Sequence, residues 1–193
     1  MIRAAVIDGH PAMRAGVEAI LARTADVVVV AATSGEPHTV EHALYRTAPD
    51  VVIIGDDPGH LDGVQLARLI KGLPSAPRIV LYAEAIDATQ VGAAMLAGAD
   101  ALVDTRGDAA ALVAAVRSAA RGEPAFPELD VAALAARLPS DYRAILQLRF
   151  GAVSPREIAR SLGLDAGTLR ARVTAMIELL RPTGAATMPA TPC

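Results

Sequence analysis

The sequence predicts an α/β fold, a doubly wound five-stranded parallel sheet, followed by a small all-α domain. Two observations carry this prediction. Over the first 121 of 193 residues, five short β-branched, apolar segments alternate with five longer segments of helical character. Beyond a connector that contains prolines, the strand signal disappears and helices separated by short glycine-containing turns follow.

The five predicted strands are apolar without alternation, as strands are when helices cover both faces of a parallel sheet. They cover residues 2–7, 27–32, 51–54, 79–81 and 101–103. The intervening helices cover residues 12–23, 37–47, 63–72, 88–97 and 109–121. Val17, Ile20 and Leu21 show the spacing of a helix that buries one stripe. Strict alternation of the two element types predicts right-handed crossover connections.

Composition and charge restrict the function classes. Hydrophobic residues make up 53% of the chain and charged residues 20%, which excludes a disordered chain. No apolar run approaches the ~20 residues of a membrane span, and the single Cys, Cys193, cannot form an intramolecular disulfide. We therefore expect a soluble, cytoplasmic protein with no membrane partner.

Charge divides unevenly between the two parts. Residues 1–138 carry 11 basic and 17 acidic side chains, a net charge of −6. Residues 139–181 carry 7 arginines and 4 acids, a net charge of +3. A basic second part favours a polyanion as its partner.

Polar residues gather where the predicted strands end, and in a doubly wound sheet the functional crevice lies at these carboxyl ends. The four segments there read Asp8-Gly9-His10, Gly55-Asp56-Asp57, Tyr82-Ala83 and Asp104-Thr105. With Arg14-Ala15-Gly16, Asp62-Gly63 and Ala97-Gly98-Ala99 in order and spacing, residues 2–121 resemble the receiver domain of LuxR-type response regulators, a flavodoxin-like fold.

That resemblance implies a phosphotransfer site, of which this sequence retains little. Receivers use an acidic pair for Mg²⁺, an acceptor Asp, a hydroxyl residue and a lysine, because Mg²⁺ takes carboxylate ligands and phosphoryl charge needs a cation. Asp8 matches the first acid. The other positions hold Gly9, Gly55, Tyr82 and Thr105. We expect a degenerate phosphorylation pocket, comprising Asp8, Gly9, Gly55, Asp56, Tyr82 and Thr105, in an atypical receiver that acts independently of Asp phosphorylation.

The alternative is a one-residue slip that makes Asp56 or Asp57 the phosphoryl acceptor. Side chains alternate between the faces of a strand, so a neighbour does not inherit the direction of the missing Asp. Asp56 and Asp57 are then an ordinary solvated acidic loop.

The second part reads as a linker with a short helix over residues 122–138, a helix-turn-helix domain over 139–181 and a disordered tail over 182–193. Ser154-Pro155-Arg156-Glu157 is a capping box with proline at the first helical position, and Asp165 can cap the helix that continues to about Leu180. Glu157-Ile158-Ala159 and Leu162-Gly163-Leu164 resemble both LuxR-type output domains and region 4 of sigma-70-type factors.

The last helix is the expected DNA-recognition helix. Leu169, Val173, Met176, Ile177 and Leu180 share one stripe and should pack on the preceding helices. The predicted DNA-binding residues are Ser154, Arg156, Thr168, Arg170, Ala171, Arg172 and Ala175. Small residues would let the helix enter a major groove, Arg172 can pair with a guanine, and Arg170 and Arg156 suit phosphates.

We predict a transcription regulator bound to double-stranded promoter DNA, homodimeric through its receiver domain, with RNA polymerase as a further partner. Two alternatives stay open: a protein-interaction adaptor of the transcription machinery, and a regulator that senses a small molecule in the former phosphorylation pocket. No catalytic motif is present, so we expect neither an enzyme nor a cofactor. His38, Glu41 and His42 fit an inverted zinc-peptidase pattern, but they lie away from the strand ends, and we expect no metal.

Overall fold

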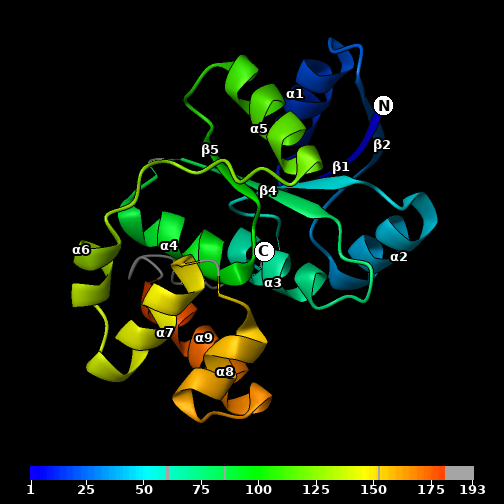
Figure 1. The fold of residues 1–193 in the computed structure, drawn as a ribbon. Coiled ribbons are helices and arrows are strands. Elements are labelled where there is room, and N and C mark those ends of the chain that lie inside the picture. Colours follow the sequence, from blue (N-terminus) through cyan, green and yellow to red (C-terminus); the bar gives the residue numbers. More distant parts are fainter. Residues whose placement is uncertain (60, 85, 152, 181–193) are drawn as a thin grey trace, which may run out of the picture.

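The computed structural model describes residues 1–59, 61–84, 86–151 and 153–180. Its first half is one parallel sheet in the order β2-β1-β3-β4-β5 (Figure 1). The strands are β1 (Ile2–Ile7), β2 (Val27–Thr33), β3 (Val51–Gly55), β4 (Arg78–Ala83) and β5 (Ala101–Asp104). All neighbouring strands pair in parallel, which confirms the predicted doubly wound sheet.

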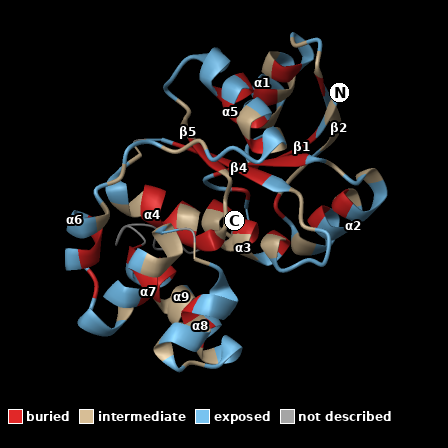
Figure 2. Cartoon of the chain, viewed as in Figure 1, coloured by how far each residue is buried: buried red, intermediate tan, exposed pale blue. Residues whose placement is uncertain are grey.

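Helices cover both faces of this sheet. On one face lie α1 (Pro11–Ala22) and α5 (Ala109–Arg121), and on the other α2 (Pro37–Thr47), α3 (Gly63–Lys71) and α4 (Ala88–Ala97) (Figure 1). Because both faces are covered, β3 is buried along its whole length, and β1 and β4 are largely red in Figure 2. Each predicted element is present, with ends shifted by at most two residues.

Four helices follow: α6 (Val131–Ala136), α7 (Ser140–Phe150), α8 (Pro155–Leu162) and α9 (Ala166–Leu180). The capping box predicted at α8 is confirmed, since Ser154 Oγ accepts from the Glu157 N–H while the Glu157 carboxylate accepts from the Ser154 N–H. Asp165 caps α9 through the N–H groups of Gly167 and Thr168. The predicted tail, 182–193, lies outside the described residues.

The segment predicted as a linker is a packed part of the structure. Ala125 pairs with Ala101 at the edge of β5, and its N–H and C=O groups bond to the backbones of Asp100 and Leu102. In α6 and just beyond it, Leu134 and Leu138 are buried. The short helix begins at Val131 because Asp130 is its N-cap.

The two parts of the chain share one continuous apolar core. α9 packs against α4, and the buried Leu134, Met176, Ile177 and Leu180 join the cluster that also contains Val91 and Ala94 of α4. Gly92 permits this close approach, because a Cβ there would overlap the side chain of Leu134 and lie 3.4 Å from a methyl of Leu180. Within the described chain, no helix is long and apolar enough to cross a membrane.

Candidate functional site

Asp8 lies just past β1, at the carboxyl edge of the sheet, and is 3% exposed. Its carboxylate accepts hydrogen bonds from the His10 N–H (2.6 Å) at Oδ1 and from the Tyr82 hydroxyl at Oδ2. The Arg14 guanidinium donates to the Asp8 main-chain carbonyl, 2.5 Å away. Both carboxylate oxygens of Asp8 are therefore held by the protein itself.

Tyr82 in β4 and Gly55 in β3 are register partners on neighbouring strands. A Cβ built on Gly55 would overlap Asp8 Oδ2 and would stand 3.2 Å from the Tyr82 hydroxyl. The place where the resemblance expects an acceptor side chain is thus taken up by the bonded Tyr82 and Asp8. Burial, and then the bond to Asp8, raises the pKa of the Tyr82 hydroxyl well above its usual value, so this hydroxyl remains a donor at neutral pH.

Gly9, at the position of the second acid, lies against the loop that follows β3. Its N–H donates to the Asp57 carbonyl (3.0 Å), and a Cβ on Gly9 would stand 2.8 Å from the same oxygen and 3.2 Å from the Gly59 nitrogen. A carboxylate side chain could enter this position only if the loop moved. The backbone at Gly9 is therefore packed for a residue without a side chain.

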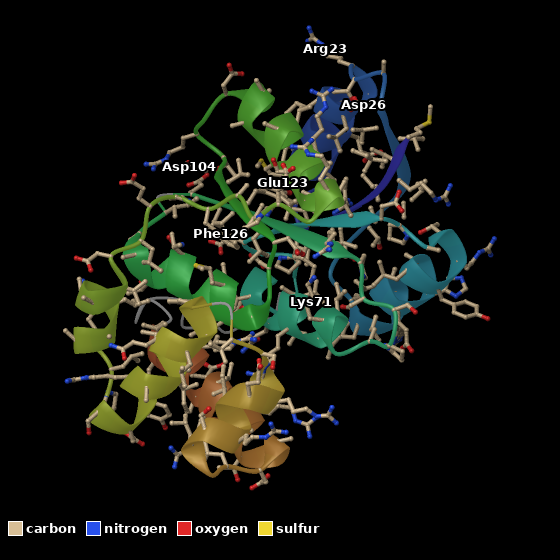
Figure 3. All side chains as sticks on the ribbon, viewed as in Figure 1. Arg23, Asp26, Lys71, Asp104, Glu123 and Phe126 are labelled. Carbon is tan, nitrogen blue, oxygen red and sulfur yellow. The ribbon has the colours of Figure 1, made fainter. Side chains whose placement is uncertain are left out.

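Thr105, at the position of the expected lysine, offers no cation. Its N–H donates to the Ala83 carbonyl, while its hydroxyl oxygen is buried and makes no hydrogen bond within the described part of the chain. The only lysine of the sequence, Lys71, lies at the other edge of the sheet, where Nζ binds Asp100 Oδ2 (2.8 Å) and the Pro77 carbonyl (3.0 Å). Figure 3 labels Lys71 at the end of α3, well apart from Asp104 in β5.

Asp56 follows Gly55 and is exposed. Its carboxyl group is nevertheless partly shielded from water, and this shielding raises its pKa above the usual value. The nearby carboxylates of Asp62 and Asp57 raise the same pKa further. Asp57 is also exposed, and its carboxylate accepts from the Gly59 N–H (3.1 Å).

The space beside Asp56, near the carboxyl ends of β3 and β4, is small. It measures about 20 Å³ and is lined by Asp56, Gly63, Gln90 and Tyr82 among others. That volume holds about one water molecule. An organic ligand therefore has no room in this space.

The predicted DNA-binding residues fall into two groups on α8 and α9. Arg156 near the start of α8, and Arg170 and Ala171 in α9, are exposed, while Arg172 and Ala175 are half-buried. Two predicted contacts already have a structural task. The Ser154 hydroxyl is bonded to Glu157, and the Thr168 hydroxyl is bonded to Asp165 Oδ2 (2.5 Å). Both hydroxyl groups therefore take part in helix caps.

One side of α9 faces the receiver-like half, which the sequence did not predict. The Arg68 guanidinium of α3 donates to the Arg170 carbonyl (3.0 Å), and the Gln65 amide donates to Glu178 Oε1 (3.4 Å). These two contacts hold one side of α9 against α3. A signal was present in the sequence, because α4 is apolar on more than one side.

No group of three or more His, Cys, Asp and Glu side chains among the described residues is arranged to hold a metal ion. His38, Glu41 and His42 share the exposed side of α2.

Comparisons with known proteins identify both parts of the chain. The profile of the response regulator receiver domain matches residues 4–117, and that of sigma-70, region 4 matches residues 128–175. The chain is 28% identical over 178 residues to the Fimbriae Z protein of Salmonella typhimurium strain LT2, covering 86% of this chain and 84% of that protein. It is 31% identical over 124 residues to the transcriptional regulatory protein LiaR of Bacillus subtilis strain 168, covering 64% and 58%.

Among solved structures, a LuxR-family two-component response regulator from Aurantimonas sp. SI85-9A1 superposes with a TM-score of 0.60 at 25% identity, over 65% of this chain and 89% of that one. A receiver followed by a region 4 helix-turn-helix defines the class of protein, a DNA-binding transcription regulator. Since the receiver profile spans more than half of the sequence, the chain belongs to the response regulator receiver domain family.

Proposed function

We propose that this protein is a promoter-binding transcription regulator whose receiver domain acts independently of Asp phosphorylation. The observation that carries the proposal is the Tyr82–Asp8 hydrogen bond, which passes beside the point where a Gly55 side chain would stand. A phosphoryl group needs an acceptor carboxylate, a bound Mg²⁺ and a cation in one place. Gly55, Gly9 and Thr105 supply none of them.

The receiver is then held in one conformation by its own side chains, or is shifted by something other than a phosphoryl group. A ligand changes the balance between two conformations only if it binds one of them more tightly. Without an acyl phosphate at residue 55, there is no phosphoryl group that could bind one conformation of the receiver more tightly than the other. The remaining alternative acceptors, Asp56 and Asp57, are exposed and lie outside the Asp8–Tyr82 contact.

The output partner we propose is double-stranded DNA. Arg156, Arg160, Arg170 and Arg172 lie on α8 and α9, the two helices of the helix-turn-helix, and Arg149 lies on α7. The sequence from 139 to 181 is the basic part of an otherwise acidic chain. We further propose that the protein binds DNA as a homodimer formed through its receiver domain, because paired half-sites require two recognition helices. We also propose that it is cytoplasmic and that RNA polymerase is a second partner.

Binding of the full chain to genomic DNA tests this function. Immunoprecipitation with sequencing yields the preferred site, and affinity for that site is then measured at several salt concentrations, with and without beryllofluoride and Mg²⁺. We expect affinity to fall steeply with salt, sequence preference to survive, and beryllofluoride to have no effect. Absence of any DNA preference would favour the adaptor function, and a beryllofluoride response would contradict phosphorylation independence.

A further inference from the structure

A second cavity lies on the other helical face of the sheet, between α1 and α5. It measures about 280 Å³, and Tyr82 lines both it and the small space beside Asp56. The floor contains the buried side chains of Val17, Tyr82 and Leu112, while the rim contains exposed residues such as Gly16. The cavity is thus closed by apolar side chains below and accessible from solvent above.

Its wall contains a polar group that lacks a partner. Thr105 lines the cavity, and its hydroxyl oxygen is buried without a hydrogen bond among the described residues. Buried hydroxyl groups in folded proteins are nearly always bonded, because an unmet hydrogen bond is costly. A 120° rotation about χ1 of threonine can move its hydroxyl to the place of its methyl group. A polar group of a molecule in the cavity could therefore complete the bonding of Thr105.

The charges at the rim select against an anion. Asp104 and Asp108 both line the opening. The Arg106 guanidinium donates hydrogen bonds of 3.1 and 2.7 Å to the Asp104 carboxylate, so the negative charge of Asp104 is paired with a positive charge. Asp108 caps α5 through the Ala110 N–H and has no cation in the cavity lining. A carboxylate or phosphate entering here would meet like charge and apolar walls.

We propose that the cavity between α1 and α5 is a binding site for a small, uncharged, largely apolar molecule that carries one hydrogen-bonding group, which meets Thr105. Ligand cavities commonly measure about 300–1,000 Å³, so the volume here suits a molecule of one or two rings. This site goes beyond the proposed function and does not depend on it.

Indole is a suitable probe, with toluene as an apolar probe that lacks the hydrogen-bonding group and benzoate as an anionic one. Binding to the full chain is followed by the methyl NMR signals of Met13, Val17 and Leu112. We expect saturable shifts with indole. The affinity for benzoate should be lower than the affinity for indole by a factor of about ten or more. Shifts that depend on protein concentration and not on indole would overturn the proposal, because they would assign this face to a second copy of the chain.

Two variants make the test specific. Gly16→Leu adds a large side chain to the cavity lining, where a Cβ meets no atom within 4 Å, and should weaken indole binding by about tenfold or more. Ala15→Leu, on the same helix but outside the lining, is the matched control and should bind normally. Thr105→Val should lower the affinity for indole by about threefold or more and leave the affinity for toluene unchanged. Equal indole affinity of Gly16→Leu and wild type would contradict the proposal.

DNA affinity of the same variants separates this proposal from the preceding one. Gly16 lies on α1, away from α8 and α9, so Gly16→Leu should bind DNA as wild type does. Loss of indole binding with DNA binding retained supports the cavity site. Absence of indole binding in a wild-type chain that binds DNA overturns the cavity site alone.

Discussion

The hydroxyl of Tyr82 donates a hydrogen bond to Oδ2 of Asp8 across the carboxyl edge of the receiver sheet. Gly55, the register partner of Tyr82, leaves the space that this bond needs, because a Cβ at residue 55 would overlap the same carboxylate oxygen. Gly55 and Tyr82 are therefore sterically complementary. Under the function we propose, this closed contact stands where a phosphorylatable receiver would hold its phosphoryl group.

Tyr82→Phe should destabilise the protein by about 1–3 kcal/mol, because it leaves a buried carboxylate oxygen of Asp8 without its donor. Urea unfolding followed by circular dichroism measures the change. Tyr45→Phe is the matched control, since Tyr45 is 89% exposed and its loss should change the free energy of unfolding by no more than about 0.5 kcal/mol. Equal stability of the two variants would mean that the Tyr82–Asp8 bond contributes nothing.

Alkaline pH should reveal the same bond. The pKa of Tyr82 is raised above its usual value of 10.0 by burial and by Asp8, so the folded state keeps this proton at a pH where the unfolded state releases it. The resulting stabilisation is complete below about pH 10 and is lost as pH rises further. In an absorbance titration, one of the three tyrosines should ionise only as the chain unfolds. Tyr82→Phe should lack that late step, and its presence in the variant would refute the assignment.

Arg68→Ala should loosen the contact between α3 and α9. The guanidinium donates to the Arg170 carbonyl and lies near Glu178, while its Nη1 is buried without a hydrogen bond in the described structure. Because one of its nitrogens is unbonded, the expected loss is modest, about 0.5–1.5 kcal/mol. Backbone hydrogen exchange in α9 should become about threefold to tenfold faster. Arg117→Ala, which breaks the exposed pair with Asp26, is the control and should leave α9 unchanged.

Arg172 and Arg170 should affect DNA binding differently. If Arg172 pairs with a base, Arg172→Ala should weaken binding to the preferred site by about 1–3 kcal/mol and reduce discrimination between sequences. Arg170→Ala, which removes the proposed phosphate contact, should weaken binding to all DNA sequences alike and reduce the salt dependence of binding. Fluorescence anisotropy with specific and unrelated duplexes measures both effects. Wild-type affinity in both variants would refute the placement of α9 in the groove.

The sequence predicts the fold closely because each element has a local signal. β-branched runs indicated the strands, and Ser154, Asp165 and Gly163 indicated the ends of α8 and α9. The emptied acceptor position was also visible, since Gly55 and Tyr82 stand at recognisable strand ends. The bond between Tyr82 and Asp8 was not, because it depends on side-chain direction across two strands.

The packing of the helical part against the receiver domain could not be predicted from local sequence patterns. Of the stripe that the helical wheel of α9 predicted, Leu169, Met176, Ile177 and Leu180 are buried, while Val173 is half-buried. The wheel could not show that the partners of this stripe include α4 as well as the neighbouring helices. Nor could it show that the Thr168 hydroxyl donates to Asp165, because that bond depends on side-chain rotamers.

Intact-mass spectrometry tests phosphorylation independence most directly. The full chain is incubated with acetyl phosphate and Mg²⁺, beside a Gly55→Asp variant and a phosphorylatable receiver as positive control. We expect no added phosphoryl group on the wild type. The variant should also stay unmodified, because Tyr82 and Asp8 occupy the space and no lysine is present at residue 105. Stoichiometric addition of one phosphoryl group to the wild type, mapped to Asp56 or Asp57, would contradict phosphorylation independence.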